Sequence, residues 1–444
     1  MHSSLRTRSA GFGRRVLWPF LTAILITPGM ATHVFAQDGL ASTPGDPGPN
    51  RNLIGLTPDP ADIRDSKARQ QNEPSCAVRP GNSACIICGY NDYRTIDVFN
   101  DGWQGVSMSC DGGYNWVSRI APGSPADPNI DARINGVFAA DPRMVAIPGM
   151  AMLNFIAGYR DNNDGVVAVQ HWLEINKEDA DHYEPGKYTY TVDDGTSGKF
   201  LDKPDMLAVL DPPAQQNQVT LLTEMENPEL GTIERSFPSG TLYVAYAAFT
   251  GSQSVKVLVN TSRDWGQTWT NQTLKLSEDQ NLVSGISLTA IGDTVLATWR
   301  RASDNNDFDS IMYAWITQGG KKATKGQVLA NICTFDQVST ASPLRVTFRT
   351  NDFPWAANDG KNFYVFYSDR GFGGDCATGH PRIVMNYAGA NNKAFQAAPI
   401  PIDAAPTDEF GTPSPESLQF MPTAFGANGK VQVAWYDTRR EVGL

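Results

Sequence analysis

One pattern recurs along most of the chain, and it constrains the fold more than any other feature of the sequence. In the typical unit a proline leads into a short apolar strand, and after a turn a second apolar strand ends in an aromatic residue followed by charge. Six units begin at positions 74, 142, 204, 287, 354 and 422, so successive starts are 68, 62, 83, 67 and 68 residues apart. The fourth unit lacks the proline and is placed by Ser287. A period of this length indicates repeated structural units.

A regular period with several short strands per unit is the signature of a β-propeller. The sequence therefore predicts an all-β fold, a six-bladed β-propeller. A β-sandwich would explain the strands, but not the repeated order from proline to aromatic residue. The sixth unit stops at Leu444, just after what would be its second strand, so we expect the last blade to be incomplete. We favour a truncated chain over the alternative, in which residues 37–70 supply a closing strand.

The first 70 residues differ in composition from the repeat. Residues 1–36 contain four arginines, then the apolar run from Val16 to Ile26, then a small residue, Ala36. This order is typical of a secretory signal peptide, and the apolar run is far shorter than the ~20 residues that span a bilayer. Residues 37–70 are rich in proline and glycine and lack apolar periodicity, which indicates a linker or an extended N-terminal arm. The propeller is expected over residues 71–444.

Export determines the charge that the mature chain carries. The sequence has 36 Lys and Arg against 47 Asp and Glu, a net charge of -11. Removal of residues 1–36 takes away four arginines and no acid, which leaves -15. Such a surface repels nucleic acid, and no later apolar run is long enough to span a membrane. We therefore expect a protein that is secreted, periplasmic or attached to the cell surface, with no nucleic-acid partner.

All six cysteines lie after residue 36, and disulfides are the default in an exported protein. Four of them fall on neighbouring strands of the first unit. Cys76 is expected to pair with Cys85 or Cys88, and the remaining one of those two with Cys110. The last two cysteines, in the fourth and fifth units, are expected to pair with each other.

Two segments, Ser109 to Trp116 and Ser262 to Trp269, both fit the pattern Ser-x-Asp-x-Gly-x-x-Trp. The pattern suits a hairpin tip, because Asp accepts hydrogen bonds from turn amides and Gly takes a positive φ. It resembles the Asp-box, or BNR repeat, of the sialidase (neuraminidase) superfamily. That resemblance covers about residues 73–444 and implies a sialidase-like β-propeller, in which the box is a structural turn away from the active face.

The same resemblance implies candidates for a catalytic site. Sialidases begin their first blade with an Arg-Ile-Pro segment whose Arg helps to bind the substrate carboxylate, and the matching segment here is Asn72-Glu73-Pro74. A neutral Asn beside a carboxylate would not bind an anion in this way. Arg94 matches a further Arg of the family, and either Asp97 or Asp101 matches its acid/base Asp. We therefore expect weak or no sialidase activity.

The family's topology places the start of the first strand and the loop after the second strand of each blade on one face. The resemblance thus implies an acid-rich ligand face. Its members would be Glu73, Asp92, Asp141, Arg160, Asp202, Lys203, Arg300, Asp352, Asp369, Arg370, Tyr436 and Asp437. The alternative is a solvated rim of salt bridges, which would contribute little energy.

Two polar clusters follow the second strand of the second and fourth units. One contains Asp161 and Asp164, and the other contains Asp304 and Asp307. Clustered carboxylate and amide oxygens suit Ca²⁺, which prefers oxygen ligands, although an Asx-rich turn is the simpler interpretation. We expect no required cofactor, because the few histidines after residue 36 are scattered and form no Ser-His-Asp or zinc motif.

Together these patterns predict an exported, sialidase-like β-propeller that binds a glycan or another extracellular ligand at its charged face. One alternative is an active exo-sialidase or a related glycoside hydrolase that uses a paired acid and nucleophile. Another is a structural or adhesive scaffold in a surface assembly. The sequence leaves the ligand and the oligomeric state open.

Overall fold

The computed structural model describes residues 71–438, with the exception of some internal positions. Strands dominate, and the α-helix α2 (Ile96–Phe99) and three short 3-10 helices are the helical elements of the described chain. The all-β class expected from the sequence is confirmed. The expected signal peptide and arm lie outside the described residues. The exceptions are 135, 160–163, 176–182, 196–197, 252–253, 271, 279, 281, 304–307, 335–350, 373–375, 377–378, 404–416 and 428.

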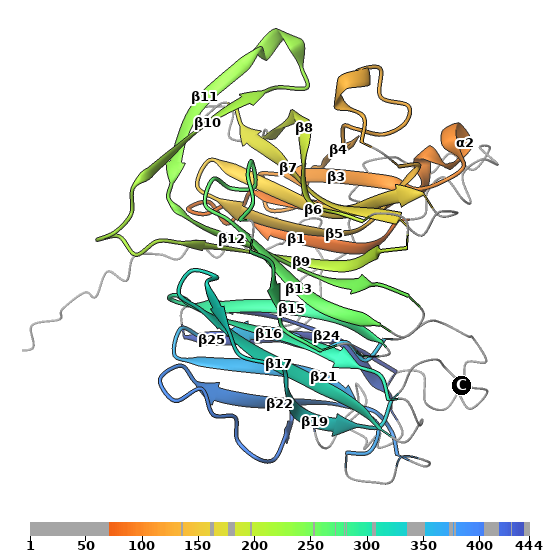
Figure 1. Ribbon diagram of the computed structural model, residues 1–444, viewed down its shortest axis with the longest axis vertical. Helices are drawn as coiled ribbons and strands as arrows, with labels where there is room; N and C mark the ends of the chain where they lie inside the picture. Colours follow the sequence, from red (N-terminus) through yellow and green to blue (C-terminus); the bar gives the residue numbers. More distant parts are fainter. Residues whose placement is uncertain are drawn as a thin grey trace, which may run out of the picture. The chain divides into compact units, whose positions relative to one another are not determined.

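The strands form successive antiparallel sheets, one for each unit of the sequence (Figure 1). The first sheet contains β1 (Gln71–Val78), β2 (Ile86–Asp92), β3 (Trp103–Ser109) and β4 (Val117–Ile120). The second contains β5 (Phe138–Ile147), β6 (Met150–Tyr159), β7 (Asp164–Glu174) and β8 (Tyr183–Asp194). The third contains β9 (Phe200–Leu210), β12 (Gly240–Phe249), β13 (Val255–Ser262) and β14 (Leu274–Lys275). A hairpin of β10 (Gln218–Glu224) and β11 (Thr232–Pro238) is inserted between β9 and β12.

The later sheets continue the order. The fourth contains β15 (Val283–Ile291), β16 (Thr294–Arg301) and β17 (Asp309–Thr317), with both β18 (Lys322–Ala323) and β19 (Gln327–Ile332) paired to β17. The fifth contains β20 (Trp355–Asn358), β21 (Asn362–Asp369), β22 (Arg382–Gly389) and β23 (Ile400–Pro401). The sixth contains β24 (Gln419–Ala427) and β25 (Lys430–Asp437). The number of blades and the closure of a ring stay predictions.

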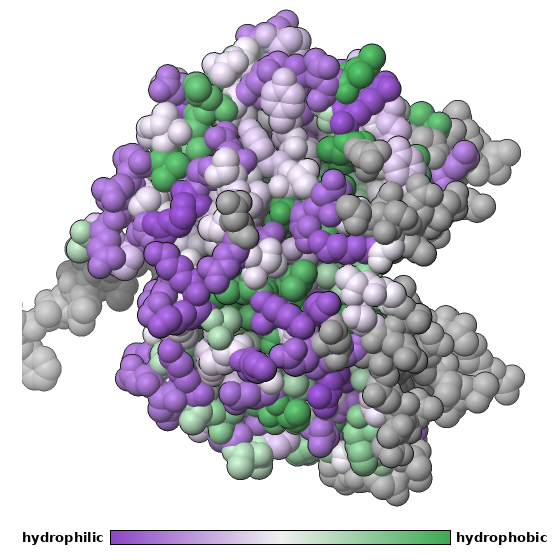
Figure 2. Space-filling view, in the orientation of Figure 1, coloured by the Kyte–Doolittle hydropathy of each residue, from purple (hydrophilic) through white to green (hydrophobic). Residues whose placement is uncertain are grey.

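The sheets pack face to face in the order of the sequence. The first strand of each sheet lies beside the first strand of the next, from β1 and β5 to β20 and β24. Four apolar clusters fill the spaces between successive sheets from the first to the fifth, and the fully buried Trp103, Trp172, Trp265 and Trp299 belong to them. Burying one large apolar side chain contributes ~1.5–3 kcal/mol, so these clusters are the main stabilising interaction. Figure 2 accordingly shows mostly hydrophilic residues on the visible face.

A hydrogen bond near the repeated proline joins several sheets to the next. The Ser75 hydroxyl accepts a bond from the Met144 amide at 3.0 Å, and the Ser287 hydroxyl accepts one from the Ala356 amide at 3.0 Å. In the third sheet the Asp205 carboxylate takes this role, and it also pairs with Arg143 of the second sheet at 2.6 Å. Such bonds satisfy polar groups that packing between sheets would otherwise bury without a partner.

Three disulfides link the six cysteines, and none of these cysteines is free. Cys76 pairs with Cys88, Cys85 pairs with Cys110, and the third bond joins the fourth and fifth sheets through Cys333 and Cys376. The pairings expected from the sequence are confirmed, and the choice it left open is settled by strand register, because Cys76 lies directly opposite Cys88. No helix within the described residues is long and apolar enough to cross a membrane.

Candidate functional site

The repeated prolines stand in β-bulges of the first strands. In β1 the register shifts between Asn72 and Ser75, and equivalent shifts occur in β5 and β9. In each case the residue before the proline has a positive φ: 52° at Glu73, 56° at Asp141 and 45° at Lys203. A bulge turns a side chain out of the regular alternation of a strand, so these three residues can point to a common place.

This backbone conformation is costly for residues other than glycine. A side chain in a sparsely populated φ region costs ~1–3 kcal/mol, and a following proline restricts the backbone further. The fourth sheet has the same register shift, but its bulge residue is Gly285, with a φ of 66°. Glycine adopts that conformation without strain. The first three sheets therefore keep charged side chains where glycine would be easier to accommodate, which points to a role outside folding.

Glu73, Asp141 and Lys203, which we call the bulge cluster, interact directly. The Lys203 ammonium lies 2.7 Å from Glu73 Oε1 and 2.5 Å from Asp141 Oδ1. Asn91 supports both acids, since its amide donates to Glu73 Oε2 at 3.1 Å and its carbonyl oxygen accepts from the Asp141 backbone amide at 2.9 Å. The side chains of Asp141 and Lys203 are 10% and 19% exposed, whereas Glu73 is 39% exposed. Contacts thus hold the three side chains of the bulge cluster in place, and Glu73 is the member that is most accessible to a ligand.

Two groups of the bulge cluster, Glu73 and Lys203, have shifted pKa values. Burial, a hydrogen bond with Asp141 and the negative charge of Asp141 raise the pKa of Glu73 above its ordinary value of 4.5, and Lys203 offsets only part of this. Burial lowers the pKa of Lys203, but the charges of Asp141 and Glu73 more than compensate and the pKa is raised. Glu73 is therefore the group most able to exchange a proton here, beside a lysine that stays charged.

A cavity of about 380 Å³ opens beside the bulge cluster. Tyr93, Tyr159 and Phe200 contribute aromatic surface to its lining, and Asn72 and Asp202 contribute polar groups. Its volume lies within the ~300–1,000 Å³ that small-ligand sites occupy, and polar or charged side chains make up much of its lining. No arginine is among the described residues that line it.

The candidates implied for catalysis are placed elsewhere. Arg94 donates to Asp92 Oδ2 at 2.7 Å and to the Ser118 hydroxyl at 3.0 Å, and neither Arg94 nor Asp92 lines the cavity. Asp101 accepts a bond from the Gly102 amide at 2.8 Å and does not line it either. Asp97 lies in α2, and its side chain is outside the described part of the structure.

The remaining residues of the expected ligand face are spread over the fourth, fifth and sixth sheets, and none of them lines the cavity. Arg300 is paired with Asp309 at 2.5 Å. Arg370 donates to the Gly379 carbonyl at 3.1 Å, and Asp352 is buried. The structure thus brings together Glu73, Asp141, Asp202 and Lys203 out of the larger expected set, and Arg160 lies outside the described residues.

The other residues of the expected ligand face, Asp369, Tyr436 and Asp437, also have contacts within their own part of the structure. Burial raises the pKa of Asp369, which accepts bonds from the amides of Cys333 and Gly371. Tyr436 is exposed and stacks on Phe420, and Asp437 accepts a bond from the Trp435 ring at 3.3 Å. These contacts are local to the fifth and sixth sheets.

The calcium candidates Asp161, Asp304 and Asp307 lie outside the described residues, as does the side chain of Asp164 at the start of β7. Among the residues that are described, no group of three or more His, Cys, Asp or Glu side chains is arranged to hold a metal ion. The calcium site stays a prediction.

The two Ser-x-Asp-x-Gly-x-x-Trp segments form matching turns. Asp111 accepts bonds from the Ser109 hydroxyl and the Asn115 amide, and Asp264 accepts the equivalent bonds from the Ser262 hydroxyl and the Thr268 amide. The first turn follows Ser109, which pairs with the start of β2, whereas the bulge cluster lies towards the other end of that strand. The segments are therefore away from the cavity.

No protein-family model and no curated protein sequence matches the chain. Its structure is similar to those of several glycosidases. A mutant NanB sialidase from Streptococcus pneumoniae has a TM-score of 0.40 and 12% identity, over 88% of this chain and 68% of that one. Trypanosoma rangeli sialidase in complex with the inhibitor DANA has a TM-score of 0.45 and 11% identity, over 83% of this chain and 53% of that one. The α-L-arabinofuranosidase arb93a from Fusarium graminearum has a TM-score of 0.41 and 12% identity, over 84% and 94%. Sialidases are thus among the solved structures that this chain resembles.

Sequence reasoning missed the aromatic lining of the cavity and the supporting role of Asn91. Tyr159 carries a signal that could have been used, because it is the aromatic residue that ends the second strand of its unit. Phe200 has no comparable signal, since its place beside the cavity depends on how the second and third sheets pack.

Proposed function

We propose that the protein is exported and binds a neutral or cationic glycan at the bulge cluster, with weak or no sialidase activity. The observation that carries this proposal is the set of three charged side chains held at strained bulge positions beside one cavity. Strain that persists against an available glycine alternative is commonly kept for function. The paired disulfides suit an oxidising compartment.

The charges at the cavity disfavour an anionic ligand. A sialoside carboxylate would meet Glu73, Asp141 and Asp202, and its one cationic partner among the described lining residues would be Lys203. That ammonium is already within 2.7 Å of two carboxylates. Arg94, which could have supplied a bidentate partner, is engaged by Asp92. A neutral sugar would instead use the carboxylates as hydrogen-bond acceptors and the aromatic side chains as packing surface.

The raised pKa of Glu73 favours a second candidate, a glycoside hydrolase in which Glu73 is the general acid. Glu73 and Asp141 share a hydrogen bond, so they lie closer than the ~5–5.5 Å of retaining or ~6.5–9.5 Å of inverting glycosidases. A hydrolase would need a different second carboxylate, and Asp202 is the remaining acid among the described residues that line the cavity. Binding therefore fits the geometry better than hydrolysis.

A parallel assay of binding and hydrolysis tests both candidates. Fluorogenic sialosides and neutral glycosides would be offered to the full chain, to Lys203→Met and to Lys430→Met, an exposed control in the sixth sheet. We expect negligible sialoside turnover, and at least one neutral glycan whose binding at the bulge cluster is lost in Lys203→Met and kept in Lys430→Met. Strong sialoside turnover lost in Arg94→Ala would contradict the proposal. Neutral-glycoside turnover that falls ~10²-fold or more in Glu73→Gln would establish the hydrolase instead.

A further inference from the structure

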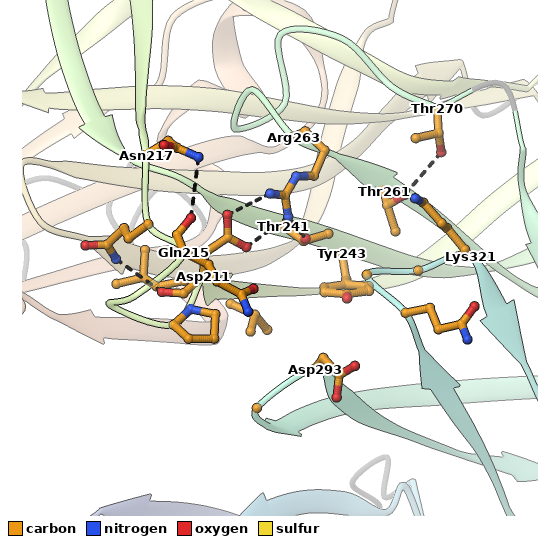
Figure 3. A pocket seen from close by; sticks show the side chains of 18 of the residues that line it. Asp211, Gln215, Asn217, Thr241, Tyr243, Thr261, Arg263, Thr270, Asp293 and Lys321 are labelled. Atoms are coloured by element: carbon orange, nitrogen blue, oxygen red, sulfur yellow. Dashed lines mark hydrogen bonds and ion pairs between the residues drawn. The ribbon is translucent and has the colours of Figure 1, made fainter.

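A larger cavity lies at the opposite end of the third sheet, between that sheet and the fourth (Figure 3). Its volume is about 1180 Å³. One wall is the loop 211–217 after β9, and the other is the turn 318–321 between β17 and β18. We call it the inter-sheet groove. Lys203 and the end of β9 are separated by seven residues, or ~20 Å of extended strand, so a ligand in the groove would not reach the bulge cluster cavity.

The charges that line the groove are balanced. Two acids, Asp211 and Asp293, face two bases, Arg263 and Lys321. Arg263 is paired with Asp211 at 2.7 Å and also donates to the Thr241 hydroxyl at 2.6 Å (Figure 3). Because the groove has no net charge and its arginine is already paired with an acid, it offers little electrostatic attraction to an ionic ligand. Its ligand should be neutral.

Groups that both donate and accept hydrogen bonds are concentrated in the groove. Side-chain amides occur on both walls, and hydroxyls lie between them. Sugar hydroxyls also both donate and accept, so this chemistry matches a carbohydrate, and Pro212 and Pro213 offer apolar surface to the C–H face of a ring. The amides and hydroxyls are those of Gln215, Gln216, Asn217, Gln272, Gln318, Thr241, Tyr243, Thr261 and Thr270.

The turn that forms the second wall of the groove has an unusual backbone conformation. Gln318, Gly319 and Gly320 all have positive φ, of 58°, 61° and 86°. A Cβ at Gly320 would lie 2.4 Å from the Thr261 side chain, so the turn approaches β13 as closely as a glycine allows. Gln318 adopts a conformation that favours glycine, and it lines the cavity. This strained side chain is the second observation that points to a ligand.

We propose that the inter-sheet groove binds a neutral oligosaccharide, and that it does so independently of the bulge cluster. Gln318 and Lys321 on one wall and the amides of residues 215–217 on the other would hold successive sugar units. A protein with sites at both ends of the third sheet could engage a polysaccharide at two points, which raises its overall affinity.

Isothermal titration calorimetry of the full chain with xylohexaose, arabinohexaose, cellohexaose and maltohexaose tests this. Measurements in a Lys203→Met background isolate the groove from the bulge cluster. Gln318→Gly removes the amide and relieves the backbone, so the fold should be kept. We expect it to weaken the binding of at least one hexaose about fivefold or more, because a ligand hydrogen bond is lost. Lys393→Gly is the matched control, since Lys393 also has a positive φ, of 53°, and lies outside the groove.

Three outcomes would overturn the proposal. The first is that none of the four hexaoses binds to the Lys203→Met chain, which includes the case in which the groove takes a protein partner. The second is that Gln318→Gly and Lys321→Ala both bind the hexaoses as tightly as their Lys203→Met background does. The third is that Lys393→Gly weakens binding as much as Gln318→Gly does. Loss of binding to the bulge cluster alone would leave the groove titration unchanged, so the two proposals fail separately.

Discussion

The bulges of the first three sheets and those of the later sheets share one backbone geometry but carry opposite chemistry. In the first three sheets the residue before the proline is Glu73, Asp141 or Lys203, and the three side chains form one ionic cluster. At the equivalent positions the fourth sheet has Gly285 and the sixth has Met421, with φ of 66° and 52°. The fold therefore requires the bulge, while the charge on it is specific to one half of the repeat.

Packing in the later sheets explains part of this difference. A Cβ at Gly285 would lie 2.2 Å from the side chain of Phe353, the residue before the proline of the fifth unit. Phe353 thus occupies the space that a side chain at 285 would need. In the first half the corresponding space is the cavity beside the bulge cluster. The comparison teaches that packing closes the bulge of the fourth sheet, in what we call the closed half of the repeat, whereas the bulges of the first three sheets, the open half, border a cavity.

The largest expected loss of stability comes from a substitution at the bulge of the fourth sheet, in the closed half. Gly285→Ala combines a residue other than glycine at positive φ with a clash against Phe353, and we expect it to lower the free energy of unfolding by ~2–5 kcal/mol. Chemical denaturation followed by tryptophan fluorescence measures this. A variant as stable as the parent protein would show that the closed half tolerates a side chain at its bulge.

A pH effect of similar size is expected in the open half, where His171 of β7 is fully buried and bonded to the Trp265 carbonyl at 2.8 Å. Burial lowers the pKa of His171 from 6.5 to about 4, although that bond and Asp264 oppose it. Between pH 4 and pH 6.5 the His171 imidazole is therefore protonated in the unfolded chain and neutral in the folded chain. Stability should therefore fall by up to ~3 kcal/mol as pH decreases from 6.5 to 4, and stop falling on this account below 4.

Denaturation at a series of pH values compares the native chain with His171→Gln. The variant lacks the titrating ring, so its loss of stability across this window should be smaller by that amount. Equal slopes for the two proteins would mean that His171 keeps its ordinary pKa when folded.

A smaller effect is expected at the turns remote from the cavity. Asp111→Ala removes the acceptor for the amides of the Ser109 to Trp116 turn, and these amides are exposed enough to bond to water instead. We expect a loss of ~1 kcal/mol in stability and no change in ligand affinity. Reduced glycan binding at an unchanged melting temperature would reverse this assignment.

The sequence predicts the fold better than the site, for physical reasons visible at particular residues. The repeated order of proline and paired apolar strands is a local pattern, so the succession of antiparallel sheets could be anticipated. So could the cysteine pairings, apart from the choice between Cys85 and Cys88 as the partner of Cys76. Glu73, Asp141 and Lys203 were also anticipated, but as members of a broad rim. Each precedes a repeated proline, but this local feature does not show that the three side chains meet. Their grouping depends on bulges and on packing between sheets. Arg94 pairs with its near neighbour Asp92 and does not line the cavity beside the bulge cluster, and its part in catalysis stays a prediction.

The smallest expected change in stability belongs to Glu73→Gly, and it tests the central claim most directly. Glycine relieves the strain at a φ of 52°, and the lost ion pair is partly exposed, so we expect the melting temperature to stay within the range of a surface substitution. Met421→Gly makes the same backbone change in the closed half and serves as the control. Each variant would be titrated with the neutral glycan whose binding is lost in Lys203→Met, and melted in parallel. Our account predicts that Glu73→Gly folds normally and loses glycan binding while Met421→Gly keeps it; undiminished binding by Glu73→Gly, or a collapse of its stability like that expected for Gly285→Ala, would contradict the account.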